Sequence, residues 1–432
     1  MGDRVATTQR LAQTGDAVSV RVLRQFWKRD ATPQRPAIPD AAPDPEVARR
    51  RRLLLARQRL SGIFTPSGPV AAASAEEAGD PDGSSLIGRE AEREQILRAL
   101  VEDRMHVLIH GERGMGKTSL ANFAVAQLRR ADFLLARHVC AAGAGFDTIL
   151  GALIGELRHA ATARDPALAA RLPARPLPPM EARAALDALG EVRAVLVVDE
   201  FDRIADDATR VAFADLLKYC SDRRLPLSFL LVGVAETAGQ LLGGHPSVQR
   251  CLARLALPLL ADAEIERIVA RGEAAGLSVP PPLRRAIATL ARGMPYMAQL
   301  LSLRAGQAAL TEGRMDLRGE DLRAAIDAAI AEADPVAQTL YDRVTAGGRD
   351  AAMVQLLRAA AAGARDAFGR FAAASGPASF RVAGIAADPA AFRRALGAGA
   401  IRPVQQSSLY AFGCTLLPPL VLLRTVQERR AA

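Results

Sequence analysis

One loop constrains this chain more than any other feature. Residues 111–118 read Gly-Glu-Arg-Gly-Met-Gly-Lys-Thr, which is the spacing GxxxxGK[ST]. An apolar run at 105–110 predicts a short buried strand before the loop, and an amphipathic pattern predicts a helix from Lys117 to Arg130 after it. Glycines let the backbone form a nest of N–H groups around phosphates, and the helix N-terminus adds its positive dipole end. The loop therefore predicts a phosphate-binding turn, with a chance glycine-rich turn as the alternative.

Further apolar runs place this loop in a sheet. Runs at 133–139, 194–198, 227–234 and 255–257 predict strands, and helical patterns separate them. Strands buried on both faces and separated by helices are typical of a three-layer parallel α/β sheet, here over residues 86–260. Residues 261–334 then contain only helical patterns, with breaks at 276–282, 293–295 and 311–319, and are expected to form a helical lid.

A second motif supplies acids to this loop. The apolar run at 194–198 is followed directly by Asp199 and Glu200. In nucleotide hydrolysis Lys117 would neutralise the β- and γ-phosphates, while Thr118 and Asp199 would hold Mg²⁺. Glu200 would polarise the attacking water. Acids at a strand end also occur as helix caps, and for Asp202 that alternative is equally good.

Cysteine spacing and the uncharged segments bear on where in the cell the protein is expected. The four cysteines are scattered without a CxxC pair, which favours a reducing, cytoplasmic location over a disulfide framework or a zinc site. The uncharged run at 409–423 is short and broken by glycine and proline, so no membrane helix is expected there. The first ten residues lack the apolar stretch of a signal peptide.

The charge is uneven along the chain. Residues 1–60 carry 13 basic and 6 acidic side chains, residues 335–432 carry 12 and 5, and the net charge of the whole chain is +9. Basic ends around an acidic middle indicate anion-binding appendages. An arginine-rich composition with only three lysines explains the same numbers equally well. Residues 1–85 are expected to be largely disordered, with proline-rich linkers at 31–45 and 65–85 and a short basic helix at 45–60.

The last hundred residues predict a separate domain. Helical patterns at 335–346, 350–362, 365–375 and 388–396 precede a strand–turn–strand pattern at 401–412. This order is typical of a winged helix-turn-helix domain over 335–432. In such a domain Arg393 and Arg394 would meet double-stranded DNA, and Arg402 would contact its backbone from the wing. Winged helices also bind proteins or their own core, and that alternative stays open.

Five segments together resemble a known family. They are LIGREAE (86–92), GERGMGKTS (111–119), VVDEFD (197–202), LVGVAET (231–237) and HPSVQR (245–250), and they resemble bacterial AAA+/STAND-like P-loop ATPases related to the origin-recognition-complex type. The resemblance covers about residues 64–335 well and residues 336–432 weakly. It implies ATP and Mg²⁺ as cofactors, an AAA+ core with a winged helix, and ATP-dependent homo-oligomers. The nucleotide-binding residues that it implies are Ile87, Gly88, Arg89, Gly111, Glu112, Arg113, Gly114, Met115, Gly116, Lys117, Thr118, Ser119 and Pro295.

The resemblance also implies a residue that acts between subunits. Arg250 would reach the nucleotide of a neighbouring copy and share in catalysis, with Arg254, one expected helical turn on, as the alternative. A solvated helix arginine is the competing interpretation. Two departures from the family pattern lie near the nucleotide: Glu236 and Thr237 stand where a sensor asparagine is usual, and Arg292-Gly-Met-Pro295 replaces an obvious sensor-2 arginine. Both departures favour slow hydrolysis.

The sequence as a whole predicts a regulatory ATPase. It would act as a nucleotide-dependent conformational or assembly switch, with DNA as a partner. One alternative is a signalling or defence switch whose winged helix binds protein. The other is a small-molecule P-loop kinase, which the lid, the C-terminal domain and the water-activating pair Asp199 and Glu200 disfavour.

Overall fold

The computed structural model describes residues 45–64, 86–173, 175–235, 239, 248–375, 380–404 and 407–431. Two compact units divide the chain at Arg52 and Leu53. In the first unit the described residues form the start of helix α3 (Pro45–Phe64), where Arg50 pairs with Glu46 at 2.7 Å. The second unit, residues 53–432, contains all the elements that follow.

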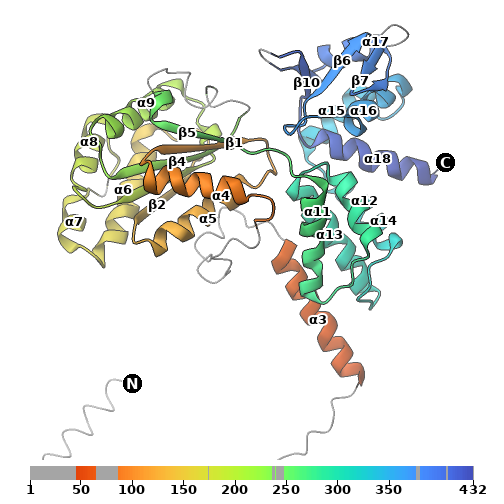
Figure 1. Cartoon of the computed structure of the whole chain (residues 1–432), viewed down its shortest axis with the longest axis horizontal. Helices are drawn as coiled ribbons and strands as arrows, with labels where there is room; N and C mark the ends of the chain where they lie inside the picture. The colour runs from red at the N-terminus through yellow and green to blue at the C-terminus, as the bar shows by residue number, and fades with distance from the viewer. Residues whose placement is uncertain are drawn as a thin grey trace, which may run out of the picture. The chain divides into compact units, whose positions relative to one another are not determined.

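A five-stranded parallel sheet forms the centre of residues 86–260 (Figure 1). Its strands lie in the order β2-β3-β4-β1-β5, and every neighbouring pair is parallel. The bounds are β1 His106–Gly111, β2 Leu134–Val139, β3 Ala194–Asp199, β4 Leu227–Val234 and β5 Leu252–Ala256. The expected parallel sheet is confirmed.

Helices cover both faces of this sheet, which explains the uninterrupted apolar runs of its strands. Ile109 and Val197 pack into one cluster with helix α5, whereas Leu108 and Leu196 pack into another cluster on the opposite face. The first face carries α4 (Glu90–Leu97), the π-helical turn η2 (Arg98–Glu102) and α5 (Lys117–Arg130). The second carries α6 (Phe146–Thr162), α7 (Pro166–Arg171), α8 (Pro179–Asp187) and α9 (Asp207–Asp222).

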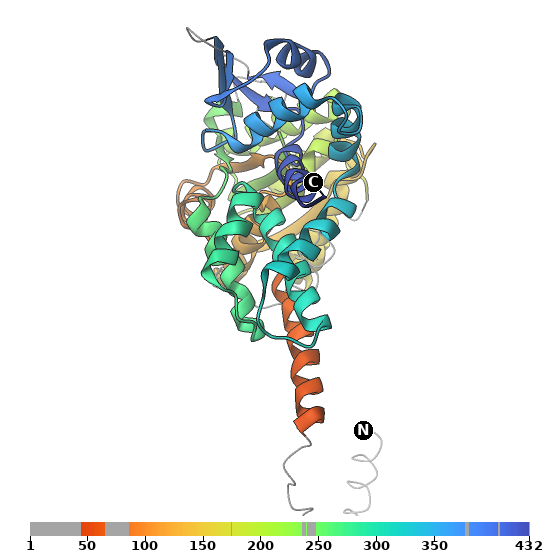
Figure 2. The ribbon, with the colours of Figure 1, turned by 90° about the vertical axis from the view of Figure 1, so that its right-hand side faces the viewer.

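Four α-helices and one 3₁₀ turn follow the sheet and confirm the helical segment expected at 261–334. They are α11 (Asp262–Ala270), η5 (Arg271–Ala275), α12 (Pro281–Ala291), α13 (Pro295–Thr311) and α14 (Gly319–Ala331). The C-terminal half of α3 packs on them (Figure 2). Its residues Leu60 and Phe64 are almost completely buried. A Cβ atom at Gly306 of α13 would lie 2.6 Å from Leu60, so glycine permits this close approach.

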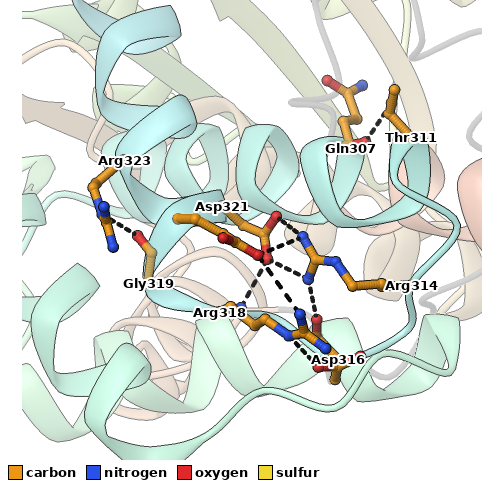
Figure 3. A network of polar contacts seen from close by, with 9 residues as sticks. Gln307, Thr311, Arg314, Asp316, Arg318, Gly319, Asp321 and Arg323 are labelled. Carbon is orange, nitrogen blue, oxygen red and sulfur yellow. Dashed lines mark hydrogen bonds and ion pairs between the residues drawn. The ribbon is translucent and has the colours of Figure 1, made fainter.

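A buried carboxylate organises the loop before α14 (Figure 3). Both oxygens of Asp321 accept hydrogen bonds from the Arg314 guanidinium, at 3.0 and 2.7 Å. The backbone N–H of Arg318 donates to the same carboxylate at 2.8 Å. Asp321 is 2 % exposed, and pairing with Arg314 compensates the cost of burying its charge.

Residues 335–431 combine helices with an antiparallel sheet. The helices are α15 (Pro335–Thr345), α16 (Ala351–Ala362), α17 (Pro389–Gly397) and α18 (Leu417–Ala431). The strand order is β8-β7-β6-β10-β9, with bounds β6 Phe371–Ser375, β7 Phe380–Val382, β8 Ile385–Ala386, β9 Ile401–Pro403 and β10 Leu409–Phe412. The expected helices at 335–346, 350–362 and 388–396 and the hairpin at 401–412 are confirmed, while the winged-helix fold of the domain stays a prediction.

The helix expected at 365–375 is wrong. The Asp366 carboxylate accepts hydrogen bonds from the backbone N–H groups of Phe368 and Arg370, which closes a turn in place of a helix. Gly369 has a φ of +75° within this turn, and residues 371–375 then pair with β7 and β10.

The uncharged run at 409–423 spans β10 and the start of α18. Its two prolines occupy the first turn of the helix, where a missing N–H interrupts no intrahelical bond. None of the helices in the described ranges is both long and apolar enough to span a membrane.

Candidate nucleotide-binding site

A cleft of about 610 Å³ opens at the carboxyl ends of β1, β3 and β4. Its walls come from the Gly-rich loop, from the residues after β3, and from the first residues of α13 in the lid. The cleft therefore gathers segments that are far apart in the sequence. The predicted site residues that line it are Ile87, Arg89, Arg113, Gly114, Met115, Gly116, Lys117, Thr118, Ser119, Asp199, Glu200 and Pro295.

The loop between β1 and α5 has the backbone that a phosphate nest requires. Gly114 and Gly116 have φ values of +81° and +87°, which only glycine adopts without strain. Gly116 also precedes the first turn of α5, whose free N–H groups point out of the helix end. A Cβ atom at Gly114 would lie 3.1 Å from Tyr296, and the Tyr296 N–H donates to the Gly114 carbonyl at 3.3 Å. The lid thus contacts the loop directly.

Lys117 is buried beneath the loop. Its Nζ donates to the carbonyl of Glu112 at 2.8 Å. Burial lowers the pKa of Lys117 to about 8, although the charges of Asp202, Glu112 and Asp199 act in the opposite direction. A phosphate beside this ammonium group would favour its charged form.

Asp199 is the last residue of β3, and the two oxygens of its carboxylate have different neighbours. Oδ1 lies 3.5 Å from the hydroxyl of Thr118, and Oδ2 accepts a hydrogen bond from Arg137 at 2.6 Å. Arg137 is fixed in turn by Asn122, whose Oδ1 accepts from the same guanidinium at 2.5 Å. A hydroxyl and a carboxylate oxygen that face each other suit Mg²⁺, which takes one or two protein oxygens and completes its shell with phosphate and water. Thr118 and Asp199 are therefore the residues that could hold the metal.

Glu200 has a strained backbone. Its φ of +54° is unusual for a residue with a side chain, and such conformations concentrate at functional sites at a cost of about 1–3 kcal/mol. Its N–H donates to Asp199 at 2.9 Å, and its carboxylate pairs with Arg203 at 2.8 Å. Arg203, in the 3₁₀ turn η3 (Phe201–Arg203), also lines the cleft.

Asp202 does not cap the following helix. Its carboxylate accepts a hydrogen bond from the backbone N–H of Val234 at 2.7 Å and so joins the ends of β3 and β4. The cap of α9 is Asp206, which accepts from the N–H groups of Ala208 and Thr209.

Part of the cleft wall is apolar. Ile87, Leu260, Ile268 and Pro295 line it and offer a surface that suits a purine base. Arg89 is 3 % exposed, and its guanidinium donates to the carbonyls of Met115 and Pro258 and to Glu92. These bonds tie Met115 of the Gly-rich loop to Pro258 through the Arg89 guanidinium.

Several predicted residues lie outside the cleft. Gly88 and Gly111 have positive φ values at its border, and Glu112 lines a different cavity. Arg250 is exposed at the end of the 3₁₀ turn η4 (Val248–Arg250). Arg254 lies in β5, so the expectation of one helical turn between the two arginines is wrong: residues 252–256 pair with β1 instead. Glu236 and Thr237 lie outside the described residues.

The three predicted DNA contacts have different surroundings. Arg394 pairs with Asp350 at 3.0 Å, and Arg402 pairs with Glu112 of the Gly-rich loop at 3.4 Å. Arg393 is exposed, and among the described residues it has no ion pair. Sequence reasoning missed the partners of Asp199 and Glu112, since each depends on elements that only the fold brings together. It also missed Arg203, which a local 3₁₀ turn places beside Glu200.

A family model matches the part of the chain that carries most of this site. Residues 85–232 match the model of a family described as "AAA ATPase domain". No curated protein matches this sequence.

Three of the solved structures that resemble this chain are the following. The Aeropyrum pernix ORC2 protein is 16 % identical with a TM-score of 0.48, over 80 % of this chain and 95 % of that one. Cdc6p from Pyrobaculum aerophilum is 17 % identical with a TM-score of 0.46, over 86 % and 98 %. The Thermotoga maritima RuvB Holliday junction branch migration motor is 16 % identical with a TM-score of 0.40, over 60 % and 77 %.

The family match spans the Gly-rich loop, the acids after β3 and most of the sheet that carries them. The resemblance to AAA+ P-loop ATPases is therefore confirmed, and the chain carries an AAA ATPase domain in residues 85–232.

Proposed function

We propose that this protein binds Mg-ATP in the cleft, hydrolyses it slowly, and uses the nucleotide to switch its conformation or assembly. One observation carries the proposal. Lys117, Thr118, Asp199 and Glu200 line a single cleft, with the Thr118 hydroxyl facing a carboxylate oxygen of Asp199.

Each of these side chains has a defined task in the proposal. The N–H groups of the loop and the Lys117 ammonium bind the β- and γ-phosphates. Thr118 and Asp199 hold Mg²⁺, which would neutralise charge on the phosphates. Glu200 accepts a proton from the water that attacks the γ-phosphate.

Slow turnover fits the surroundings of Glu200. Its carboxylate is paired with Arg203, so it must leave this partner before it can act on water. A switch benefits from such a delay, because the nucleotide-bound state then persists long enough to be recognised.

The test of this proposal is Glu200→Gln. The amide cannot accept the proton, so phosphate release should fall by about 10²–10⁴-fold while ATP binding is retained. Asp207→Asn is the matched control, since Asp207 is an exposed acid on the nearby helix α9. Phosphate release at the parent rate in Glu200→Gln, with the control also unchanged, would remove Glu200 from the mechanism.

A second candidate concerns the C-terminal domain. Its basic residue Arg402 and the hydroxyl of Thr415 both contact Glu112 of the nucleotide loop, the latter at 2.5 Å. These contacts favour a switch whose C-terminal domain acts on its own core over one whose wing is committed to DNA.

Binding to duplex DNA distinguishes a C-terminal domain that acts on its own core from one that binds DNA. If the domain binds DNA through Arg393, then Arg393→Ala should weaken binding and reduce the slope of log affinity against log salt by about one. Arg381→Ala, an exposed arginine on β7, is the control. An unchanged slope in Arg393→Ala would favour the candidate in which the C-terminal domain acts on its own core.

A further inference from the structure

A second cavity, of about 270 Å³, borders the start of the nucleotide loop. Gly111 and Glu112 form part of its wall, and residues of the lid and of the C-terminal domain complete it. It lies wholly within the unit of residues 53–432. The volume is just below the range of about 300–1,000 Å³ typical of small-molecule sites.

Two arginines give this cavity an unbalanced positive charge. Arg292 donates through Nη2 to the carbonyl of Gly363 at 2.9 Å, but its buried Nε has no partner. Arg365 makes no hydrogen bond or ion pair with any residue in the described part of the chain. Burial, followed by repulsion from Arg292, lowers the pKa of Arg365 to about 10.

The remaining arginines of the cavity are already paired. Arg370 is bonded to Asp366 at 2.6 Å, and Arg402 is paired with Glu112 at 3.4 Å. Asp262 acts on Arg292 and Arg365 only through its field, and it is the weakest of the influences on Arg365. An anion is therefore the group that Arg292 and Arg365 lack.

The rest of the wall is largely apolar. Leu257, Leu259, Met294, Phe368 and Phe412 line it. A free inorganic anion would leave this surface unfilled, whereas an anion with an apolar body would bury it.

We propose that this cavity binds a small organic anion, a carboxylate or a phosphate ester on an apolar body, with its charged group between Arg292 and Arg365. Both arginines lie outside residues 85–232, the part of the chain that matches the AAA ATPase domain.

Hydrogen bonds also connect the wall of this cavity to the nucleotide loop. Thr415 and Arg402 line the cavity, and both bond the Glu112 carboxylate. The Glu112 carbonyl in turn accepts the hydrogen bond of Lys117. An occupant that shifts Thr415 or Arg402 therefore shifts the loop, so the bound anion acts as an effector of ATP binding. This effector role rests on the proposed function, whereas the site does not.

Fluorescence of the dye anilinonaphthalene sulfonate tests the site, because the dye joins a sulfonate to an apolar body. The parent protein should bind it saturably. Octanoate or octyl phosphate should displace it, and the better competitor identifies the preferred anion. Octanol should not displace it, since it lacks the charge; equal displacement by octanol would overturn the proposal.

Variants locate the dye. Arg365→Gln should weaken binding by about tenfold or more, Arg365→Lys should restore much of it, and Ala411→Leu should block it by filling the cavity. Arg381→Gln, an exposed arginine on β7, is the matched control, and thermal unfolding checks that each variant folds. Parent-like binding in both Arg365→Gln and Ala411→Leu would contradict the site.

Two further results separate this site from the nucleotide cleft. Dye binding should persist in Lys117→Ala, so a failure of ATP binding would leave this proposal standing; loss of dye binding in that variant would overturn it as a separate site. The displacing anion should change ATP affinity in the parent but not in Arg365→Gln. Unchanged ATP affinity in the parent would contradict the effector role.

Discussion

The carboxylate of Asp199 carries the electrostatic balance of the nucleotide cleft. It is 2 % exposed, and Arg137 is the cation that compensates it on one side. Its other oxygen faces Thr118, where Mg²⁺ would add two positive charges. In the proposed site, Arg137 and Mg²⁺ would therefore share one buried carboxylate without competing for the same oxygen.

Arg137→Met tests this balance. Removing the guanidinium leaves Asp199 buried and uncompensated, so the free energy of unfolding without nucleotide should fall by about 3–5 kcal/mol. Mg²⁺ with ATP should then raise the unfolding temperature more in the variant than in the parent, because the metal becomes the main compensating charge. The measurement is thermal unfolding with and without Mg-ATP.

Arg164→Gln is its control, because the ion pair of Arg164 with Asp132 lies at the surface and its other bonds go to the backbone carbonyls of Asp132 and Phe133. An equal or smaller Mg-ATP shift in Arg137→Met than in the parent would show that Arg137 does not share the carboxylate with the metal.

Single residues of the cleft differ in how well the sequence predicts them. Lys117 and Thr118 are predictable because a loop of eight residues defines their geometry, and Asp199 follows from its place at the end of an apolar run. Arg137 is not predictable in the same way. It reaches Asp199 only because β2 lies beside β3 in a register that sets Val139 opposite Asp199. Arg203 and Arg402 likewise depend on turns and domain contacts that leave no local pattern.

Among the elements, β1 is fixed at its first residue by a buried histidine. The Nδ1 atom of His106 accepts from the Phe229 N–H on β4 at 3.0 Å, and Nε2 donates to the Leu217 carbonyl on α9 at 2.8 Å. Burial lowers the pKa of His106 to about 4 from its usual 6.5. The neutral ring thus joins two strands and a helix.

This histidine makes stability depend on pH. Between pH 6.5 and 4 the unfolded chain binds a proton at His106 that the folded protein does not, so stability is complete above pH 6.5 and is lost as the pH falls toward 4. From pH 7 to pH 5 the loss should be about 2 kcal/mol. Urea unfolding at the two pH values measures it.

His106→Asn should lose less stability than the parent over the same pH interval, whatever its own stability at pH 7. His159→Asn, at an exposed position on α6, should lose as much as the parent. Identical pH dependence in His106→Asn and the parent would show that this ring does not carry the effect.

Helices are predictable from the sequence where the hydrophobic periodicity and the capping residues indicate the same bounds. Helix α17 begins at Pro389 after the capping residue Asp388, and α5 begins directly at Lys117, as the sequence indicates. The segment at 365–375 is not predictable in this way, because the Asp366 carboxylate accepts hydrogen bonds from the N–H groups of Phe368 and Arg370. The turn that these bonds close outweighs the helical tendency of the alanines.

For the whole molecule, the proposed switch predicts assembly driven by ATP. Arg250 is exposed at the end of η4 and outside the cleft of its own chain, so it is available to a neighbouring copy. A contact made only between copies would stabilise the assembly whenever ATP is bound. Arg250→Ala should therefore keep ATP affinity while it abolishes the ATP-dependent rise in mass.

Light scattering over a range of ATP concentrations measures this rise. Arg349→Ala, an exposed arginine after α15, is the control and should assemble as the parent does. A parent protein that stays monomeric at every ATP concentration would exclude the mechanism.

At this scale the sequence predicts the order of the parts but not their contacts. The basic C-terminal segment is evident from composition, and DNA is the partner that composition suggests. The bonds from Thr415 and Arg402 to Glu112 join residues about 300 positions apart in the chain, so no periodicity or motif contains them.

The central claim is that the cleft binds Mg-ATP, and calorimetric titration of ATP in the presence of Mg²⁺ tests it most directly. Lys117→Ala removes a charged hydrogen-bond donor from the phosphates and should weaken ATP binding by about 10- to 150-fold. Lys218→Ala, at an exposed lysine of α9, should bind as the parent does. ATP binding by Lys117→Ala with the affinity of the parent would contradict the claim.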